Sequence, residues 1–172
     1  LVTGASRGIG QATALALAKA GFELALVSRS LENLGPTLAD LKAAGVRAKA
    51  YALDLSDLGE IQPKIHHIVE DFGPFQVLVN NAGMGYTGPL ATMSLQDWQQ
   101  VLDLNLTSIF ECIKAALPAM RSLGSSTIIN VASIAAKSAF PNWGAYTVSK
   151  AGLVALSKVL SAEERANGVR EI

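Results

Sequence analysis

Tyr146 and Lys150 are the residues of this chain whose types and spacing best suit chemistry. They stand four positions apart in the segment YTVSK, and residues at that spacing are neighbours on one face of a helix. A phenol normally loses its proton at about pH 10, and a fixed cation nearby favours the phenolate, which makes the group usable as a proton donor or acceptor near neutrality. The pair predicts acid–base chemistry on a rigid element. The alternative is a helix in which the tyrosine packs and the lysine is solvated.

A glycine-rich segment near the start of the chain could bind a phosphate group. Residues 3–10 read TGASRGIG and join a short apolar run to a helical pattern, so backbone amides and the helix dipole would face an anion there. The spacing Gly-x-x-x-Gly-x-Gly is neither the usual dinucleotide fingerprint, Gly-x-Gly-x-x-Gly, nor the Walker pattern, which also needs Lys followed by Ser or Thr. The segment predicts a phosphate-binding turn, with a glycine-rich turn that binds no ligand as the alternative.

Short apolar runs and long helical patterns alternate along the chain. The apolar runs suit buried strands and cover residues 1–3, 22–27, 48–53, 75–79 and 127–131. The helical patterns are rich in Ala and Leu, are mostly followed by Gly, and cover residues 9–20, 31–44, 58–72, 95–123 and 145–167. This alternation predicts an α/β fold, a Rossmann-like doubly wound parallel sheet with helices on both faces. Such sheets bind ligands at the carboxyl ends of their strands.

Composition and charge narrow the class of protein. The chain has 172 residues, of which 50% are hydrophobic and 16% are charged, as suits one domain whose parallel sheet is covered on both faces. Lys and Arg number 14 and Asp and Glu number 14, so the basic field that a nucleic-acid or anionic-membrane binder needs is not expected. No apolar run reaches about 20 residues and no signal peptide precedes the first strand pattern, so we expect a cytoplasmic protein without a membrane segment.

Cysteine and histidine offer no further chemistry. Cys112 is the single cysteine, which excludes an internal disulfide, and it falls in an apolar helical run where a small core residue fits. His66 and His67 have no carboxylate or cysteine at a metal-ligand spacing. We therefore expect no catalytic metal.

The chain as a whole resembles the classical short-chain dehydrogenase/reductase family. The resemblance rests on motifs that occur in family order: TGASRGIG at residues 3–10, Asp54-Leu55, Asn80-Asn81-Ala82-Gly83, Asn105 in LNLTS, Ser133 in NVASIAA, and Tyr146-x-x-x-Lys150. It covers essentially the whole sequence, and the glycine segment is most similar to that of 3-oxoacyl-[acyl-carrier-protein] reductases. The resemblance implies an enzyme that transfers hydride between a nicotinamide cofactor and a carbonyl or secondary alcohol.

The resemblance also implies a role for each catalytic side chain. Tyr146 would give a proton to the carbonyl oxygen or take one from the alcohol. Lys150 would bind the nicotinamide ribose hydroxyls and favour the phenolate of Tyr146. Ser133 would orient the carbonyl by a hydrogen bond, and Asn105 would hold a water that links Lys150 to solvent. A local cap or turn is the alternative for Ser133 or Asn105 taken alone.

Cofactor contacts are implied at the ends of several strands. Asp54 would bind the adenine amino group, with an ordinary turn carboxylate as the alternative, and Leu55 would add a backbone contact. The Asn-Asn-Ala-Gly motif would steady the sheet and line the adenosine and ribose side. The implied cofactor-binding residues are Gly4, Ser6, Arg7, Gly8, Ile9, Gly10, Arg29, Asp54, Leu55, Asn80, Ala82, Gly83, Tyr146 and Lys150.

The choice between NADP and NAD rests on the end of the second strand. Relatives that prefer NAD carry an acidic residue there, which binds the adenosine ribose hydroxyls and repels a 2′-phosphate. This chain has Ser28-Arg29 at that place, and Arg29 could stack on adenine and pair with the phosphate, with Arg7 as a second cation. NADP(H) is therefore the predicted cofactor, with NAD(H) as the other possibility. Both arginines could instead be solvated surface charges.

The end of the chain and its partners are also judged from the resemblance. Relatives continue after the catalytic helix through a sixth strand, a Pro-Gly turn, a substrate lid and a seventh strand, whereas this sequence stops after GVREI at residues 168–172. We therefore expect the C-terminal strands and the lid to be missing and the domain, residues 1–172, to be truncated at both ends. The long helices imply a homodimer or homotetramer, as in many relatives.

Two functions remain open from the sequence. The first is an NADP(H)-dependent reductase or dehydrogenase of a small-molecule carbonyl or alcohol, such as a 3-oxoacyl thioester. Its substrate pocket could be lined by loop residues at the catalytic end, namely Met84, Gly85, Ala135, Phe140 and Trp143, with packing as the alternative for the two aromatic residues. The second is a non-catalytic dinucleotide-binding or scaffold domain.

Overall fold

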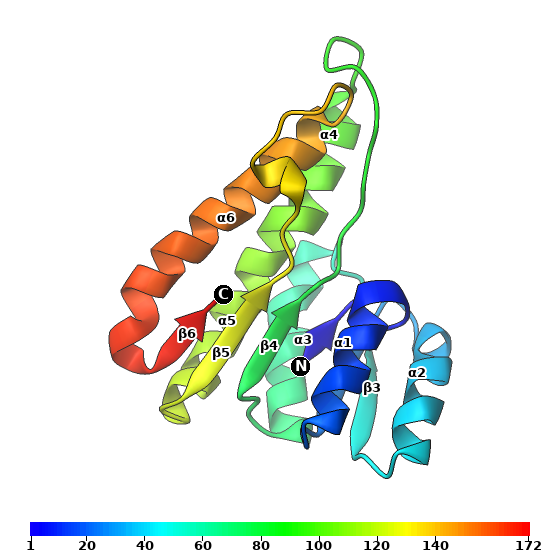
Figure 1. Cartoon of the computed structure of the whole chain (residues 1–172), viewed down its shortest axis with the longest axis vertical. Coiled ribbons are helices and arrows are strands. Elements are labelled where there is room, and N and C mark those ends of the chain that lie inside the picture. Colours follow the sequence, from blue (N-terminus) through cyan, green and yellow to red (C-terminus); the bar gives the residue numbers. More distant parts are fainter.

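The computed structural model describes all residues from 1 to 172 and contains one parallel sheet (Figure 1). The sheet has six strands in the order β3-β2-β1-β4-β5-β6. Neighbouring strands pair in parallel, for example Leu24 with Ala48 and Val79 with Ile129. The strand bounds are β1 Val2–Thr3, β2 Leu24–Ser28, β3 Ala48–Ala52, β4 Val77–Asn80, β5 Ser126–Asn130 and β6 Val169–Glu171. The predicted doubly wound α/β fold is confirmed.

Helices connect the strands and cover both faces of the sheet. Their bounds are α1 Gly8–Lys19, α2 Leu31–Ala43, α3 Leu58–Phe72, α4 Leu95–Leu102, α5 Ser108–Ser122 and α6 Gly144–Glu164. Buried side chains of α1 and α2 pack on one face of the sheet, and those of α3, α5 and α6 pack on the other. Burial of both faces explains why the strands read as nearly continuous apolar runs. None of these helices is both long and apolar enough to pass through a bilayer.

The helical pattern predicted over residues 95–123 contains a break in its regular geometry. Between α4 and α5 the backbone forms a π-helical turn, Asp103–Thr107, without ending the helix. A π-turn inserts one extra residue and is frequent at functional sites. Periodicity does not reveal this turn, because the buried positions Val101, Asn105, Ser108 and Cys112 continue through it at spacings of three or four residues.

The sixth strand corrects one expectation from the sequence. The sequence predicts that the chain ends before a sixth strand. In the structure, Val169–Glu171 form β6, which pairs with residues Ser126 to Ile128 of β5. Gly168 makes this possible: its φ is +74°, and a Cβ there would lie 2.2 Å from the carbonyl oxygen of Gly124. The strand is hard to recognise because only Val169 is fully buried, so it lacks the apolar run that marks the other strands.

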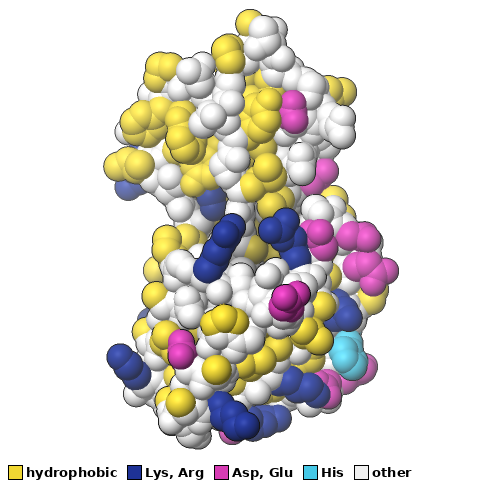
Figure 2. Space-filling model, turned by 90° about the vertical axis from the view of Figure 1, so that its right-hand side faces the viewer, with side chains coloured by type: hydrophobic (Ala, Val, Ile, Leu, Met, Phe, Trp, Pro, Cys, Tyr) yellow, Lys and Arg dark blue, Asp and Glu magenta, His cyan; other side chains and the backbone are white.

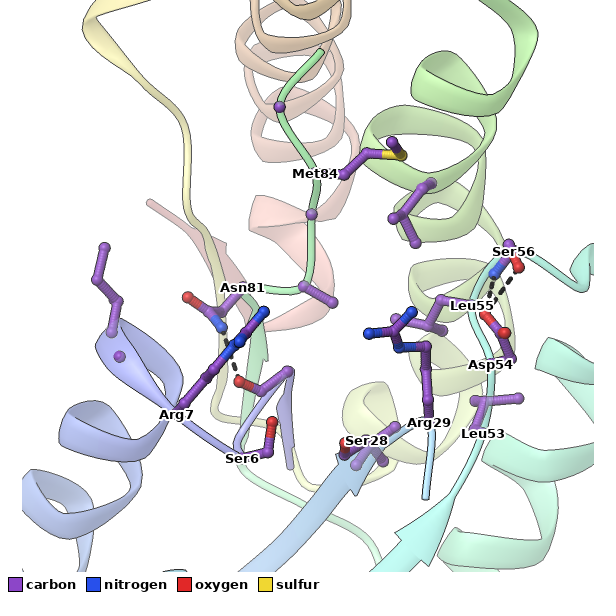
Figure 3. Close-up of a pocket in the computed structure, with 18 of the residues that line it drawn as sticks. Ser6, Arg7, Ser28, Arg29, Leu53, Asp54, Leu55, Ser56, Asn81 and Met84 are labelled. Atoms are coloured by element: carbon purple, nitrogen blue, oxygen red, sulfur yellow. Dashed lines mark hydrogen bonds between the residues drawn. The ribbon is translucent and has the colours of Figure 1, made fainter. Parts of the chain in front are cut away.

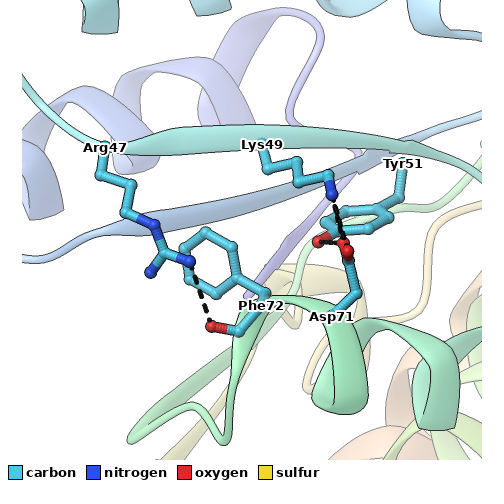
Figure 4. A network of polar contacts seen from close by, with 5 residues as sticks. All are labelled: Arg47, Lys49, Tyr51, Asp71 and Phe72. Carbon is cyan, nitrogen blue, oxygen red and sulfur yellow. Dashed lines mark hydrogen bonds and ion pairs between the residues drawn. The ribbon is translucent and has the colours of Figure 1, made fainter.

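The edge strand β3 is fastened to the end of α3 by polar contacts (Figure 4). Lys49 Nζ lies 2.7 Å and the Tyr51 hydroxyl 2.5 Å from the carboxylate of Asp71, and Arg47 lies 4.3 Å above the ring of Phe72. Burial, together with the Asp71 carboxylate, raises the pKa of Tyr51. Charged side chains on an edge strand also oppose pairing with a further chain, so this cluster has a structural explanation.

Candidate functional site

A cavity of about 790 Å³ opens at the carboxyl ends of the strands (Figure 3). Its wall is built from the segments that follow β1, β2, β3 and β4, together with one side of α4 and the π-turn. The predicted binding residues that line it are Gly4, Ser6, Arg7, Gly8, Ile9, Arg29, Asp54, Leu55, Ala82 and Gly83. The cavity volume lies within the range of small-molecule and cofactor sites.

The glycine segment makes a tight turn that only residues without a Cβ can form. Gly4 has φ +64°. A Cβ at Gly10 would lie 2.2 Å from the carbonyl oxygen of Gly4 and 2.5 Å from Nδ2 of Asn81. Gly10 is itself buried and does not line the cavity. It was predicted to bind the cofactor, but in this structure it serves the close packing of α1 beneath the cavity floor.

Asn81 was not among the predicted binding residues, yet it braces the cavity. Its side-chain amide donates hydrogen bonds to the carbonyl oxygens of Thr3, at 3.1 Å, and Gly4, at 3.2 Å. The Thr3 hydroxyl oxygen in turn accepts hydrogen bonds from the backbone N–H groups of Asn81 and Ala82. These contacts tie the loop after β1 to the loop after β4. The signal was present in the sequence, in the second asparagine of the Asn-Asn-Ala-Gly motif.

Asn80 occupies a different place from the one predicted. Its side chain is buried within the sheet and donates a hydrogen bond of 2.9 Å to Oδ1 of Asn130 on β5. It is not part of the cavity wall. The reason is its position as the last residue of β4, where its side chain still packs against the neighbouring strand, so its role here is structural.

Basic side chains gather at the cavity. Figure 2 shows Lys and Arg side chains at the hollow between the two parts of the molecule, and Figure 3 shows Arg7 and Arg29 on either side of the cavity. Both arginines are exposed and line it. Asp54 is the single carboxylate in the wall. Its Oδ1 accepts hydrogen bonds from the backbone N–H of Ser56, at 3.0 Å, and from the Ser56 hydroxyl, at 2.7 Å.

These contacts keep Asp54 ionised. The hydrogen bonds from Ser56, and to a smaller extent the charge of Arg29, lower the pKa of Asp54 below its ordinary value. The cavity wall therefore carries two cations and one anion near neutral pH. An anionic ligand fits this balance of charge.

Tyr146 and Lys150 lie on the first turns of α6, as the sequence predicts. Lys150 is only 4% exposed, and its Nζ donates a hydrogen bond of 2.7 Å to the carbonyl oxygen of Val131. Burial lowers the pKa of Lys150. The same Nζ lies 5.9 Å from the centre of the Tyr146 ring. A Cβ on Gly83 would be 3.8 Å from this Nζ, which places Lys150 beside the cavity wall at Gly83. Both Tyr146 and Lys150 are predicted cofactor-binding residues, and neither lines the cavity itself.

Ser133 lies on the loop that leads from β5 toward α6. It caps a 3-10 turn, Ile134–Ala136, which packs against α6. Its hydroxyl oxygen accepts a hydrogen bond of 3.2 Å from the backbone N–H of Ala135. That contact uses the oxygen as acceptor and leaves the O–H able to donate to another group.

Asn105 sits in the π-turn and is fully buried. Its Oδ1 accepts a hydrogen bond of 2.8 Å from the Met84 N–H, and its Nδ2 donates to the Met84 carbonyl at 2.8 Å and to the Ser149 hydroxyl at 3.1 Å. Asn105 thus holds both backbone groups of Met84, a residue of the cavity wall. Its side chain joins that wall to the helix that carries Tyr146 and Lys150.

Comparison with known proteins identifies the family. Residues 1–171 match the family model for short chain dehydrogenase. The chain belongs to the short-chain dehydrogenase family. The resemblance drawn from the sequence motifs is thereby confirmed, and as a member of this family the protein is an oxidoreductase of the class that acts on CH–OH donors with NAD(P).

Individual family members are similar along the whole chain. It is 38% identical over 170 residues to the 3-oxoacyl-[acyl-carrier-protein] reductase FabG of Staphylococcus aureus, a match that covers 98% of this chain and 69% of that protein. A metagenomic short-chain oxidoreductase solved in complex with NADP has a TM-score of 0.95 and 38% identity, covering 99% of this chain and 77% of that one. Carveol dehydrogenase from Mycobacterium avium, in complex with NAD, has a TM-score of 0.92 and 26% identity, covering 98% and 66%.

Some wall residues of this short-chain dehydrogenase were not predicted. Besides Asn81, they include Ser56, Gln100 and Leu104. Gln100 and Leu104 stand four positions apart and so share one helix face. That spacing is too common in helices to indicate a ligand site by itself. Among all described residues, no group of three or more His, Cys, Asp or Glu is arranged to hold a metal ion.

Proposed function

We propose that this protein interconverts a carbonyl and a secondary alcohol with NADP(H), using Tyr146 as the acid–base group. One observation carries the proposal: Lys150 is buried beside Tyr146 on α6, and its Nζ lies next to Gly83, a residue in the wall of a cavity whose volume suits a cofactor. The cavity and the pair come from segments far apart in the sequence. Their convergence supports a single site.

The residues of the cavity fit a dinucleotide. The glycine segment leaves space for close approach of a phosphate at the start of α1, whose first turn contains no acidic side chain. Asp54 would bind the adenine end and Leu55 would supply a backbone contact, while Ala82 and Gly83 would line the ribose side. A bound nicotinamide would supply or accept the hydride at the substrate carbon.

The side chains of α6 would handle the proton. The Tyr146 hydroxyl would donate a proton to the carbonyl oxygen in reduction and accept it from the alcohol in oxidation. The Lys150 ammonium, held by the Val131 carbonyl, would stabilise negative charge on the phenol oxygen and bind ribose hydroxyls. The Ser133 O–H would donate a hydrogen bond to the same carbonyl oxygen, which would orient it and stabilise charge that develops there.

Asn105 would hold the cavity wall and α6 in register. Its side-chain oxygen and nitrogen are both used in hydrogen bonds to Met84 and Ser149. The expected water that links Lys150 to solvent would therefore have to bind another part of Asn105. We propose it as a positioning residue for the catalytic group.

The preference for NADP(H) is proposed from charge. The end of β2 carries Ser28 and Arg29, without a carboxylate that would repel a 2′-phosphate. Arg29 and Arg7 both reach the cavity and could pair with that phosphate. The similar oxidoreductase solved with NADP supports this choice, whereas the less similar carveol dehydrogenase was solved with NAD.

Exposed apolar side chains on the two long helices α5 and α6 suggest a surface for self-association. Phe110 on α5 is 45% exposed, and Val148 and Val159 on α6 are 46% and 55% exposed. Exposed apolar side chains on long helices favour contact with a further copy of the chain. We therefore propose a homodimer or homotetramer.

Turnover of carbonyl compounds tests the proposed function. The protein should consume NADPH in the presence of an aldehyde, a ketone or a 3-oxoacyl thioester, and Tyr146→Phe should lower kcat by about 100-fold or more because the proton donor is removed. NADPH binding, measured by titration, should be retained in that variant. Tyr51→Phe removes a hydroxyl from the remote edge strand and should keep its turnover. Tight NADPH binding with no turnover of any carbonyl would instead support a dinucleotide-binding domain without catalysis.

A further inference from the structure

The ring of Trp143 contacts Tyr146 and lies near the cavity wall at Gly85. It packs edge-on against the Tyr146 ring, with 5.2 Å between the ring centres and 70° between the ring planes. On its other side, a Cβ on Gly85 would lie 3.7 Å from Cζ3 of Trp143, and Gly85 is part of the cavity wall. The indole therefore has the Tyr146 ring on one side and a residue of the cavity wall on the other.

The backbone around Trp143 is held on both sides. The Trp143 N–H donates to the carbonyl of Phe140 at 3.2 Å, and the Trp143 carbonyl accepts from the N–H of Thr147 at 2.7 Å. The preceding residue, Asn142, has φ +69° and accepts a hydrogen bond of 2.8 Å from the N–H of Gly88. Asn142 therefore has a left-handed backbone conformation, and its carbonyl is hydrogen-bonded to the neighbouring loop. Together these features fix the direction from which the indole approaches Tyr146. The ring is thus a preorganised part of the site.

Large apolar side chains are exposed on the segment that contains Trp143. Trp143 is 36% exposed, Phe140 is 45% exposed and Ile134 is 72% exposed. Phe140 and Ile134 belong to the same segment, which begins next to Ser133 and leads into Tyr146. Single exposed apolar residues are ordinary, but large ones that accumulate on the segment joining two functional residues indicate a binding surface.

We propose that Trp143 is both a positioning residue for Tyr146 and the residue that selects substrates with an apolar group next to the carbonyl. The indole restrains the phenol by edge-to-face packing, which is favourable beyond simple burial. Its remaining face gives an aryl or alkyl substituent a dry surface, and gives a hydroxylated substituent no hydrogen-bond partner in exchange for water. This inference rests on the proposed function and names the substrate class for the same site.

A comparison of two ketones tests the proposal. Acetophenone carries an aryl group beside the carbonyl, and hydroxyacetone carries a small polar one. Trp143→Ala should lower kcat/KM for acetophenone by at least about tenfold more than for hydroxyacetone, because an apolar wall is lost. Trp143→Ala should also lower kcat for both ketones. This shared decrease in kcat measures how much Trp143 contributes to the positioning of Tyr146. Trp143→Phe keeps an aromatic edge and should restore most of both effects.

Two controls make the result specific. Leu123→Ala truncates an apolar side chain that is 37% exposed at the end of α5 and does not line the cavity, and it should leave the ratio of the two kcat/KM values unchanged. Circular dichroism melting and NADPH titration show whether each variant is folded and binds cofactor. If Trp143→Ala fails to fold, Trp143→Phe and Trp143→Leu carry the comparison, with leucine expected to lose the kcat that phenylalanine keeps.

The outcomes separate this inference from the function on which it rests. An unchanged ratio and an unchanged kcat in folded Trp143 variants, with an active wild-type protein, would overturn the role of Trp143 and leave the proposed function standing. A wild-type protein that binds NADPH but reduces neither these ketones nor any other carbonyl would overturn both. A wild-type preference for hydroxyacetone over acetophenone would contradict the apolar substrate class alone.

Discussion

At the scale of single residues, the site depends on charges placed against backbone groups. Lys150 is buried and keeps one hydrogen bond, to the carbonyl of Val131, and Asp54 keeps its charge through hydrogen bonds from Ser56. Arg29 differs from both, because it is exposed and makes no ion pair within the chain. An unpaired cation in the wall of a cavity is available for a ligand.

Replacing Arg29 tests that availability. Arg29→Asp should weaken NADPH binding by about tenfold or more, since a charge-assisted contact is replaced by repulsion. NADH binding should be unchanged or tighter, because the new carboxylate could accept hydrogen bonds from ribose hydroxyls. Fluorescence titration with both cofactors measures the ratio.

The control for Arg29→Asp is Lys158→Asp, which makes the same change of charge at an exposed position on α6 away from the cavity. It should leave the ratio of the two dissociation constants as in the wild type. Equal effects of the two substitutions would mean that the net charge of the protein, and not Arg29 itself, governs the preference.

At the scale of elements, most strands and helices were predictable, and the exceptions are the π-turn beside the cavity and the short edge strand β6. Apolar runs located most strands because both faces of the sheet are buried, and glycines marked most helix ends. The π-turn at Asp103–Thr107 was missed, since the buried positions before, within and after it keep spacings of three or four residues. Strand β6 was missed because Arg170 interrupts its short apolar pattern. Tyr146 and Lys150 lie one turn apart on α6, as their spacing predicts, because that relation is set within one element.

Roles that depend on contact between elements could not be read from the sequence. Asn81 and Asn80 are adjacent in one motif, yet the first lines the cavity and the second is buried in the sheet. Gly10 was predicted to bind and instead permits close packing against Gly4. In each case the deciding fact is which neighbouring segment the residue faces, and that is set by the assembled sheet.

The contact between the π-turn and the cavity wall gives a prediction for Asn105. Asn105→Ala would leave both backbone groups of Met84 without their partner, and each buried unsatisfied group costs about 1–3 kcal/mol. We expect the free energy of unfolding to fall by about 2–4 kcal/mol and NADPH binding to weaken, because Met84 belongs to the wall. Urea unfolding and NADPH titration measure the two effects.

Gln99→Ala is the matched control for Asn105→Ala. It removes an exposed side-chain amide that donates 2.9 Å to Asp103 on the same helical segment, and it should change stability by less than about 0.5 kcal/mol. Asn105→Ala could instead have an equally small effect on unfolding and none on NADPH binding. The hydrogen bonds between Asn105 and the Met84 backbone would then have no role in holding the site.

At the scale of the whole molecule, a buried polar network joins three strands behind the cavity. Asn130 on β5 accepts a hydrogen bond from Asn80 on β4, and its amide donates to Ser157 on α6 and to Glu171 on β6. The next residue, Val131, supplies the carbonyl that binds Lys150. The network therefore connects the far edge of the sheet to the end of α6 that carries Tyr146 and Lys150. One oxygen of Glu171 has no hydrogen-bond partner.

The protonation of Glu171 should make stability depend on pH. Burial raises the pKa of Glu171 to about 7, against the opposing effect of the Asn130 amide. A folded-state pKa above the unfolded value means that the folded chain binds the proton more tightly, so this contribution is complete at acidic pH and is lost as pH rises through about 7. Because Glu171 is partly exposed, solvent screening reduces the loss to on the order of 1 kcal/mol.

Glu171→Gln should abolish this pH dependence, since its amide stays neutral. Urea unfolding at pH 5 and pH 8 should show wild-type stability falling relative to the variant by on the order of 1 kcal/mol over that interval. Glu163→Gln, an exposed change on α6, should track the wild type. A constant difference between wild type and Glu171→Gln at both pH values would show that Glu171 is ionised throughout. In that case the network would contain a charged Glu171 carboxylate. Protonation of Glu171 would then have no part in positioning the Val131 carbonyl, which accepts the hydrogen bond from Lys150.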